Sequence, residues 1–411
     1  MKTEFLNLIA PDEALQRLLQ HLDVNPSPEV VFTTQALGRV TASPVLAPHP
    51  LPEFRRSTVD GYAVRAADTY GAGESLPAYL NLIGEVRMGH STNLVLEPAQ
   101  CALIHTGGML PQNADAVVMV EDTQGSRPAE VEILRAVAVG ENLIKTGEDV
   151  SQGEEVIPVG RRLRPAEIGG LMALGFTLVK VARRPRVGII SSGDEVVPPE
   201  QRPLPGQVRD VNSYTLAAVV EQVGGEVVHY GIIPDTREAM LETAKRAHRE
   251  CDVVVITAGS SVSVRDLTAE VIAELGQPGV LVHGVNIRPG KPTILGVCDG
   301  KAVIGLPGNP VSALVNVTMF VAPVVKSLLG ESLEHPRPAV TARLLVNLAS
   351  ESGREEWVPV RLIATADGWE ADPVFGKSNL IFTLARADGM VRVVPDATGL
   401  SVGEMVEVLL F

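Results

Sequence analysis

The sequence is poor in residues that several classes of protein need. Only three of its 411 residues are cysteines, and no two form a CxxC pair, which excludes a disulfide framework and a zinc knuckle. Aromatic residues make up 4%, too few for base-stacking platforms, and the net charge of −14 repels phosphate backbones. We therefore expect no nucleic-acid or anionic-membrane surface, and a reducing cytoplasm as the location.

Motifs of the common nucleotide, zinc and esterase chemistries are also missing. The chain has no Walker A loop, GxGxxG, HExxH or GxSxG, and its eight histidines show no metal-ligand spacing. Its start lacks the basic-then-apolar order of a signal peptide. An uncharged run from Ala302 to Val325 has the length of a membrane span, but Pro307 to Pro310 interrupt it. We interpret it as a buried strand, a loop and a buried helix.

Hydrophobic patterning divides what remains into successive segments. Residues 1–50 open with an amphipathic helix from Pro11, residues 51–145 have short β-rich runs, and residues 146–180 combine a strand and turn with a helix start. Residues 181–330 alternate strand and helix, which predicts a doubly wound, mostly parallel α/β sheet. Within them, Asp299-Gly300 predicts a hairpin turn. Residues 331–411 return to strands, typical of a small barrel or sandwich.

Three strands of the α/β part are followed by loops that each supply a carboxylate: Glu195 in SSGDE, Asp235 in PD and Asp266 in AGSSVSVRD. Loop carboxylates are usually helix caps or solvated turns, but ligands of such sheets bind beyond the carboxyl ends of the strands. Three carboxylates at corresponding strand ends therefore favour a ligand-binding site. The first and third loops also offer small residues whose backbone amides suit an oxyanion: Ser192, Gly193, Gly259 and Ser260.

Two rigid loops add donors to the same edge. RPGKP holds Arg288 and Lys291 among prolines, which favours an anion subsite over a plain turn. In GLPGNPVSAL, helix capping explains Asn309 and Pro310, whereas Pro307 and Gly308 indicate a backbone path fixed for a nearby ligand. Anion donors beside carboxylates suit Mg²⁺ that bridges carboxylates and phosphates. The expected substrate is a phosphorylated small molecule.

Together, GLPGNPVSAL, SSGDE, RPGKP and the late LARADG resemble motifs of the molybdopterin molybdenumtransferases, the molybdenum insertases similar to the E domain of gephyrin. STVDGYAVR, IHTGGMLPQNADAVVMVED and GEDV resemble motifs of that family's first half, so the resemblance covers nearly the whole chain. It implies a multidomain α/β plus β fold with a molybdopterin-binding α/β domain, β-rich accessory domains and a C-terminal β-barrel. It also implies four domains and a homodimer, with residues 1–50 and 146–180 together forming an N-terminal linker and dimerisation domain.

The resemblance implies a reaction as well. Adenylylated molybdopterin is hydrolysed with Mg²⁺ while molybdate is inserted between the dithiolene sulfurs, and AMP is released. The implied catalytic set comprises Asp60, Thr106, Asp149, Glu195, Asp235 and Asp266. The last three of these are the predicted Mg²⁺ ligands. Molybdate is a tetrahedral dianion, and the cations and hydroxyls implied for it are Arg288, Lys291, Ser312, Arg354 and Ser378.

The sequence departs from the family pattern at three places. AGSSVSVRD lacks the family's glycine pair and further glycine before Asp266, GKSNL lacks glycines around Ser378, and RPGKP has Arg288 where lysine is common. These changes bear on oxyanion choice, tungstate included, or mark a diverged paralogue.

Two other functions stay open. One is a molybdopterin adenylyltransferase, which in this superfamily uses a domain like residues 183–330 alone; the β domain with Asp60 and Thr106 opposes it. The other is a non-enzymatic scaffold of the same fold, which has no need of five mutually repelling carboxylates. The protein partners to expect are a molybdopterin adenylyltransferase and molybdoenzymes.

Overall fold

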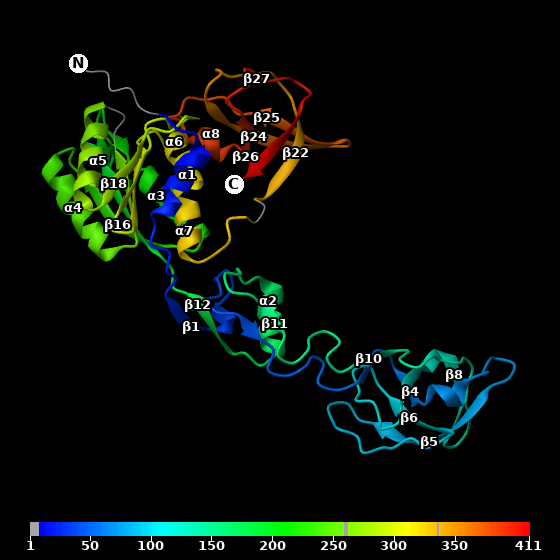
Figure 1. Cartoon of the computed structure of the whole chain (residues 1–411). Helices are drawn as coiled ribbons and strands as arrows, with labels where there is room; N and C mark the ends of the chain where they lie inside the picture. Colours follow the sequence, from blue (N-terminus) through cyan, green and yellow to red (C-terminus); the bar gives the residue numbers. More distant parts are fainter. Residues whose placement is uncertain (1–7, 259–261, 335–336) are drawn as a thin grey trace. The chain divides into compact units, whose positions relative to one another are not determined.

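The computed structural model describes residues 8–258, 262–334 and 337–411. Its chain forms two compact units (Figure 1). The first unit comprises Met1–Ala42, Gly160–Arg164 and Val179–Phe411, and the second comprises Ser43–Val159 and Pro165–Leu178. The finer division into four domains stays a prediction.

A six-stranded sheet forms the centre of the first unit. Its strand order is β16 (Glu226–Ile233), β13 (Arg186–Ser192), β17 (Val253–Ala258), β21 (Lys301–Pro307), β20 (Ile294–Cys298) and β18 (Pro278–His283). Only β20 runs antiparallel to its neighbours, and β17 is buried along its whole length, as expected for a sheet covered on both faces. Asp299 and Gly300 both have positive φ and close the β20–β21 hairpin, which confirms the predicted turn.

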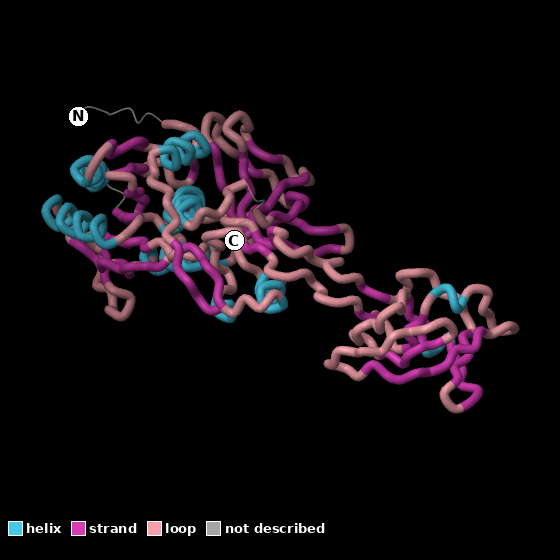
Figure 2. Tube along the Cα trace, turned by 60° about the horizontal axis from the view of Figure 1, so that its bottom comes forward, coloured by secondary structure: helices cyan, strands magenta, loops and turns pink. Residues whose placement is uncertain are grey.

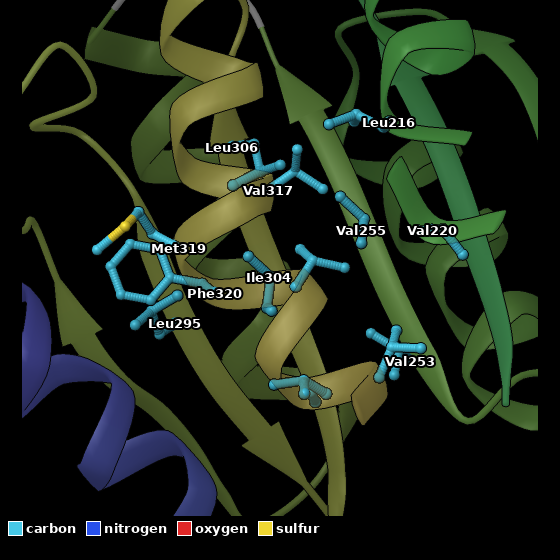
Figure 3. Packing of buried hydrophobic residues seen from close by; sticks show 14 of the residues in the cluster. Leu216, Val220, Val253, Val255, Leu295, Ile304, Leu306, Val317, Met319 and Phe320 are labelled. Atoms are coloured by element: carbon cyan, nitrogen blue, oxygen red, sulfur yellow. The ribbon is translucent and has the colours of Figure 1, made fainter. Parts of the chain in front are cut away.

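Helices cover both faces of this sheet (Figure 1). One face packs against α1 (Pro11–Gln20), α3 (Asn212–Gln222) and a long helix that follows β21, and the other against α4 (Arg237–Glu250) and α5 (Val262–Leu275). The amphipathic first helix was predicted correctly, because Ala14 and Leu18 are fully buried. Figure 3 shows Val317 and Phe320 of the long helix among the side chains of the sheet.

The long helix consists of α6 (Pro310–Asn316), a π-helical turn (Val317–Val321) and α7 (Ala322–Leu328). Among the described residues, it is the one helix with the length and apolar composition of a membrane span, and 72% of that stretch is buried inside the protein. Together with β21, it confirms the predicted buried strand, loop and buried helix. The π-helical turn was not predicted.

The C-terminal part of the first unit is a closed five-stranded barrel, as the resemblance implied. It closes because β24 (Glu355–Thr365) pairs with both β25 (Gly368–Pro373) and β26 (Gly389–Val393), and β28 (Met405–Leu410) joins β26 to β22 (Ala339–Leu344), which pairs with β25. A short strand of the α/β part, β19 (Ile287–Arg288), adds to β24 in parallel. Helix α8 (Ile381–Ala385) lies between β25 and β26 in the chain.

The second unit is rich in strands, as Figure 2 shows. Its main sheet has the order β7 (Ala116–Met119), β4 (Gly61–Val64), β6 (Gln100–Ile104), β5 (Ala78–Val86), β9 (Glu130–Ile133) and β8 (Thr123–Arg127). A Cβ at Gly61 would lie 1.9 Å from the Val118 carbonyl oxygen, so only glycine fits at that strand position. The unit also contains α2 (Pro165–Ala173).

Short two-stranded pairings complete the structure. They join β1 (Pro28–Phe32) with β12 (Leu178–Ala182), β2 (Val45–Leu46) with β11 (Glu155–Ile157), β3 (Arg56–Ser57) with β10 (Leu143–Ile144), β14 (Val196–Val197) with β15 (Val208–Arg209), and β23 (Leu348–Ala349) with β27 (Gly399–Leu400).

Candidate functional site

Two predicted acidic loops meet at the carboxyl edge of the α/β sheet. The hydroxyl of Ser192, the last residue of β13, donates to the carboxylate of Asp235, which follows β16. The Asp235 N–H donates to the carboxylate of Asp194 at 3.3 Å. Glu195 has an exposed side chain beside Gly193, where a Cβ would lie 3.0 Å from Glu195 Oε2. The prediction that these two loops lie together at the carboxyl edge of the sheet is therefore correct.

The third acidic loop differs from the expectation. We expected a loop as far as Asp266 and a helix from Leu267, but α5 begins at Val262. No glycine or proline stands between Val262 and Leu267 to delay the helix. Asp266 is therefore a helical residue with an exposed side chain. Gly259 and Ser260 lie outside the described residues.

No ready-made metal cage is present in the described part of the chain. There, no three histidine, cysteine, aspartate or glutamate side chains lie close enough together to hold a metal ion. Mg²⁺ is commonly held by one or two carboxylates, several waters and the phosphates of a substrate. The exposed Glu195 and the half-buried Asp235 fit an ion of that kind.

The GLPGNP turn is held from two sides. The side-chain amide of Asn212, at the start of α3, donates to the Gly308 carbonyl at 2.8 Å. Asn309 donates its Nδ2 to the Ser378 hydroxyl at 3.0 Å. The Val311 N–H donates to the Ser378 carbonyl, also at 3.0 Å. Two motifs far apart in sequence, GLPGNPVSAL and GKSNL, are therefore joined at the start of α6.

Helix capping by Asn309 was predicted only in part correctly. Asn309 occupies the N-cap position and Pro310 follows in the first turn, but the Asn309 side chain makes no capping hydrogen bond. It bonds Ser378 instead, because the GKSNL loop lies against this end of the helix. No side chain caps the first helical turn; instead the Val311 N–H is bonded to the Ser378 carbonyl, and Pro310 has no N–H to satisfy.

The RPGKP loop lies beside two further segments. Its Gly290 packs against Asn316 of α6, where a Cβ on Gly290 would lie 1.8 Å from Asn316 Nδ2. Through β19 and β24, Arg288 is paired in register with Glu356, so the GREEW segment with Arg354 runs alongside. The GKSNL loop thus lies at the start of α6, the RPGKP loop contacts Asn316 at its end, and GREEW pairs beside RPGKP. Ser312, within α6, is buried.

The cations of these segments have different surroundings. Arg288 Nε lies 3.5 Å from Glu356 Oε1, and Arg354 lies 3.8 Å from Glu351. The half-buried Lys291 ammonium has no hydrogen-bond or ion-pair partner among residues 8–258, 262–334 and 337–411. An uncompensated cation at a partly desolvated position attracts an anion strongly. Lys291 is accordingly the strongest candidate for the oxyanion ligand.

The second unit carries the other predicted acidic residues. Asp60 accepts the Thr106 N–H at 2.8 Å and the Thr106 hydroxyl at 3.2 Å, both on Oδ1. These bonds, the backbone one first, and the nearby His105 hold the pKa of the Asp60 carboxyl below its usual value of 3.8. Asp149 has an exposed side chain that bonds no other described residue.

Two residues near Asp60 were missed from the sequence. His105 Nδ1 lies 3.9 Å from Asp60 Oδ1, and its Nε2 lies 2.9 Å from Glu85 Oε1. The only available signal was the position of His105 immediately before Thr106. Nothing in the pattern of β5 pointed to Glu85, because the pairing of distant strands decides which residues meet.

Comparison with known proteins matches nearly the whole chain to one family. Residues 9–175 match the model described as the MoeA N-terminal region (domain I and II), residues 188–327 the model described as "Probable molybdopterin binding domain", and residues 341–411 the MoeA C-terminal region (domain IV). A relative from Methanocaldococcus jannaschii, named "Putative molybdopterin biosynthesis protein", is 35% identical over 96% of this chain and 95% of its own. A molybdopterin molybdenumtransferase of Staphylococcus epidermidis is 30% identical over 100% of this chain and 97% of its own.

Solved structures agree with the sequence comparison. Two crystal structures of molybdopterin biosynthesis MoeA proteins from Pyrococcus horikoshii superpose with TM-scores of 0.86 and 0.82. Their sequences are 32% and 38% identical, and each alignment covers 98% of this chain. The same alignments cover 100% and 99% of the two solved chains, so the shared fold is not limited to one domain.

Proposed function

Since this chain belongs to the MoeA family of molybdopterin molybdenumtransferases, and is thus a transferase of molybdenum cofactor biosynthesis, we propose that it inserts molybdate into adenylylated molybdopterin and releases AMP. One observation carries the proposal. Predicted oxyanion ligands lie on α6 itself, on the GKSNL loop at its start and on the RPGKP loop at its end, where the Lys291 ammonium has no partner among the described residues.

The oxyanion chemistry suits these residues. The Lys291 ammonium and the Ser312 and Ser378 hydroxyls are donors, as a tetrahedral dianion requires. Ser312 is buried, which favours a desolvated ligand, while Ser378 is held by Asn309. We assign Arg288 and Arg354 supporting roles, because each already lies near a glutamate.

The phosphate chemistry requires the acidic residues. Glu195 and Asp235 are the side chains of the described sheet edge that would hold Mg²⁺, which when bound would offset negative charge on the phosphoanhydride. Ser192 orients the Asp235 carboxylate through its hydroxyl. Asp60, Thr106, Asp149 and Asp266 keep the catalytic roles that the family resemblance implies.

The overall reaction balances without a redox partner. Water cleaves the phosphoanhydride bond of the adenylylated substrate and gives AMP. One oxo group of molybdate leaves as water with the thiol protons as the molybdenum–sulfur bonds form. Molybdenum stays fully oxidised throughout, so the reaction needs no redox cofactor.

The parts outside the α/β domain favour this reaction over the alternatives. An adenylyltransferase of the superfamily needs only a domain like residues 183–330, whereas here residues 9–175 and 341–411 also match family regions. A scaffold needs neither a Lys291 ammonium that has no partner among the described residues nor the ordered Ser192–Asp235 pair. We further propose a cytoplasmic homodimer that receives its substrate from an adenylyltransferase and passes the cofactor to molybdoenzymes.

The test is a reaction with purified full-length protein, adenylylated molybdopterin, Mg²⁺ and molybdate. AMP release and reconstitution of an apo-molybdoenzyme are measured together. We expect both in the wild type, and a loss of turnover on the order of 100-fold in Glu195→Ala. Formation of adenylylated molybdopterin instead of AMP would identify an adenylyltransferase. A folded protein that neither releases AMP nor adenylylates molybdopterin would favour the scaffold.

A further inference from the structure

A fully buried hydrogen-bond network joins the RPGKP loop to the helix that carries Ser312. Thr293, just after the loop, and Asn316, on α6, are both 0% exposed. The Thr293 hydroxyl lies 2.8 Å from Asn316 Oδ1. Asn316 Nδ2 donates to the Ser312 carbonyl, also at 2.8 Å. One side-chain amide therefore links the loop with the backbone of a predicted molybdate ligand.

Counting donors gives the direction of each bond. The Thr293 hydroxyl is also 2.8 Å from the Gly290 carbonyl, but a hydroxyl has a single proton to donate. The Gly290 carbonyl also accepts the Thr293 N–H at 3.2 Å, whereas the buried Asn316 Oδ1 has no other donor among the described residues. We therefore assign the hydroxyl proton to Asn316 Oδ1, which gives each end of the amide a partner. A satisfied buried network of this kind specifies one arrangement, because removing any member leaves a polar group without a partner.

The loop backbone rests directly on the same amide. Gly290 is buried with φ +117, and a Cβ there would lie 1.8 Å from Asn316 Nδ2. No other residue fits this position without moving the loop or the amide. Because Gly290 immediately precedes Lys291, the placement of Lys291 along α6 depends on where the Asn316 amide lies.

We propose that Asn316 and Thr293 are positioning residues of the molybdate site, which set the placement of Lys291 relative to Ser312. The proposal rests on the function proposed above for the identity of the anion. Neither residue contacts molybdate, since both are fully buried. Their effect reaches the substrate through Lys291 and Ser312.

A purely structural role predicts a different result. If the network only stabilises the core, its loss lowers the melting temperature and leaves the molybdate dependence of the reaction unchanged. If it positions Lys291, its loss raises the KM and Kd for molybdate, while kcat at saturating molybdate changes little. The KM-against-kcat comparison therefore separates the two roles.

The experiment uses the full-length protein with Thr293→Val, which removes the hydroxyl and nearly keeps the shape. Thr293→Ser is the conservative variant that restores the donor. Thr318→Val is the matched control, because the Thr318 hydroxyl donates to the Leu314 carbonyl of its own helix at 2.9 Å and takes no part in the loop network. Thr293→Ala replaces Thr293→Val if the valine variant does not fold.

We measure KM and kcat in the insertion assay, the Kd of molybdate alone by calorimetry, and hydrogen exchange of residues 286–293. Thr293→Val should raise KM and Kd about tenfold, change kcat less than about twofold and speed exchange in the loop. Thr293→Ser and Thr318→Val should behave like the wild type.

Two results separate failure of this proposal from failure of the proposed function. A folded Thr293→Val protein with wild-type KM, Kd and loop exchange overturns the positioning role. If the wild type neither binds nor inserts molybdate, the proposed function fails. In that case the positioning role, which concerns the same anion, fails with it.

Discussion

Arg288 Nε lies 3.5 Å from Glu356 Oε1, and Glu356 in turn accepts the Ser350 hydroxyl at 2.7 Å. The carboxylate thereby offsets the charge of the first cation of the RPGKP loop. Lys291, in the same loop, has no such partner in the described part of the chain. The two cations should therefore differ in their importance for an anionic substrate.

We predict that Lys291→Met raises the KM for molybdate roughly 10- to 100-fold, because a charge-assisted hydrogen bond is lost. Arg288→Met should raise it by less than about fivefold, since the arginine charge is already offset. Initial rates against molybdate concentration give both values. Both variants lose one positive charge from the same loop, so each is the control for the general attraction of molybdate by that charge. Equal effects would contradict the distinction between the two cations.

A second prediction concerns the ionisation of Asp60. Its pKa is lowered first by the Thr106 N–H and then by the Thr106 hydroxyl. Thr106→Val removes the hydroxyl and keeps the N–H, so the pKa of Asp60 should rise but stay below 3.8. Titration of the Asp60 carboxyl carbon by NMR measures this. A wild-type pKa at or above 3.8 would contradict it.

The sign of the stability effect follows from the same shift. A carboxyl with a lowered folded-state pKa contributes stability above its unfolded pKa, here near the usual 3.8, and loses that contribution as pH falls through the lowered value. The ionisation-dependent difference between wild type and Thr106→Val should therefore be present at neutral pH. It should disappear at pH values below the folded-state pKa, which denaturant unfolding at several pH values can measure.

A third prediction compares two glycines with positive φ. Gly290 and Gly403 have φ of +117 and +84, but a Cβ on Gly403 would meet nothing within 4 Å. Both alanine variants carry backbone strain, and only Gly290→Ala also collides with Asn316. Gly290→Ala should therefore lower the free energy of unfolding by about 1–3 kcal/mol more than Gly403→Ala. Chemical denaturation followed by circular dichroism tests this, and similar losses would show that the loop yields easily.

Much of the fold could be predicted because it is encoded in local patterns. Strand and helix periods gave the α/β sheet, and Asp299-Gly300 gave the hairpin, since both residues accept positive φ. The start of α5 was placed too late, because a serine-rich segment suggested a loop. The π-helical turn at Val317–Val321 has no signal in an uninterrupted apolar run.

Side-chain partners were much harder to predict than elements. Asn309 was expected to cap its own helix, a local interaction, but bonds Ser378 in a distant loop. His105 meets Glu85 only because β5 and β6 pair in parallel. Such contacts depend on the completed fold, and sequence spacing does not encode them. The site residues found by motif were therefore placed by resemblance rather than by physical deduction.

The pairing of β19 with β24 has a consequence for how this protein can be divided. Residues 287–288 belong to the α/β part, yet their main chain is bonded to a strand of the C-terminal barrel. An excised fragment that ends near residue 330 would lack β24 and so leave this short strand without its backbone partner. A chimaera that takes its C-terminal barrel from a relative must therefore keep the backbone pairing of Arg288 with Glu356. This requirement holds even if the side chains around the pairing are similar in the two proteins.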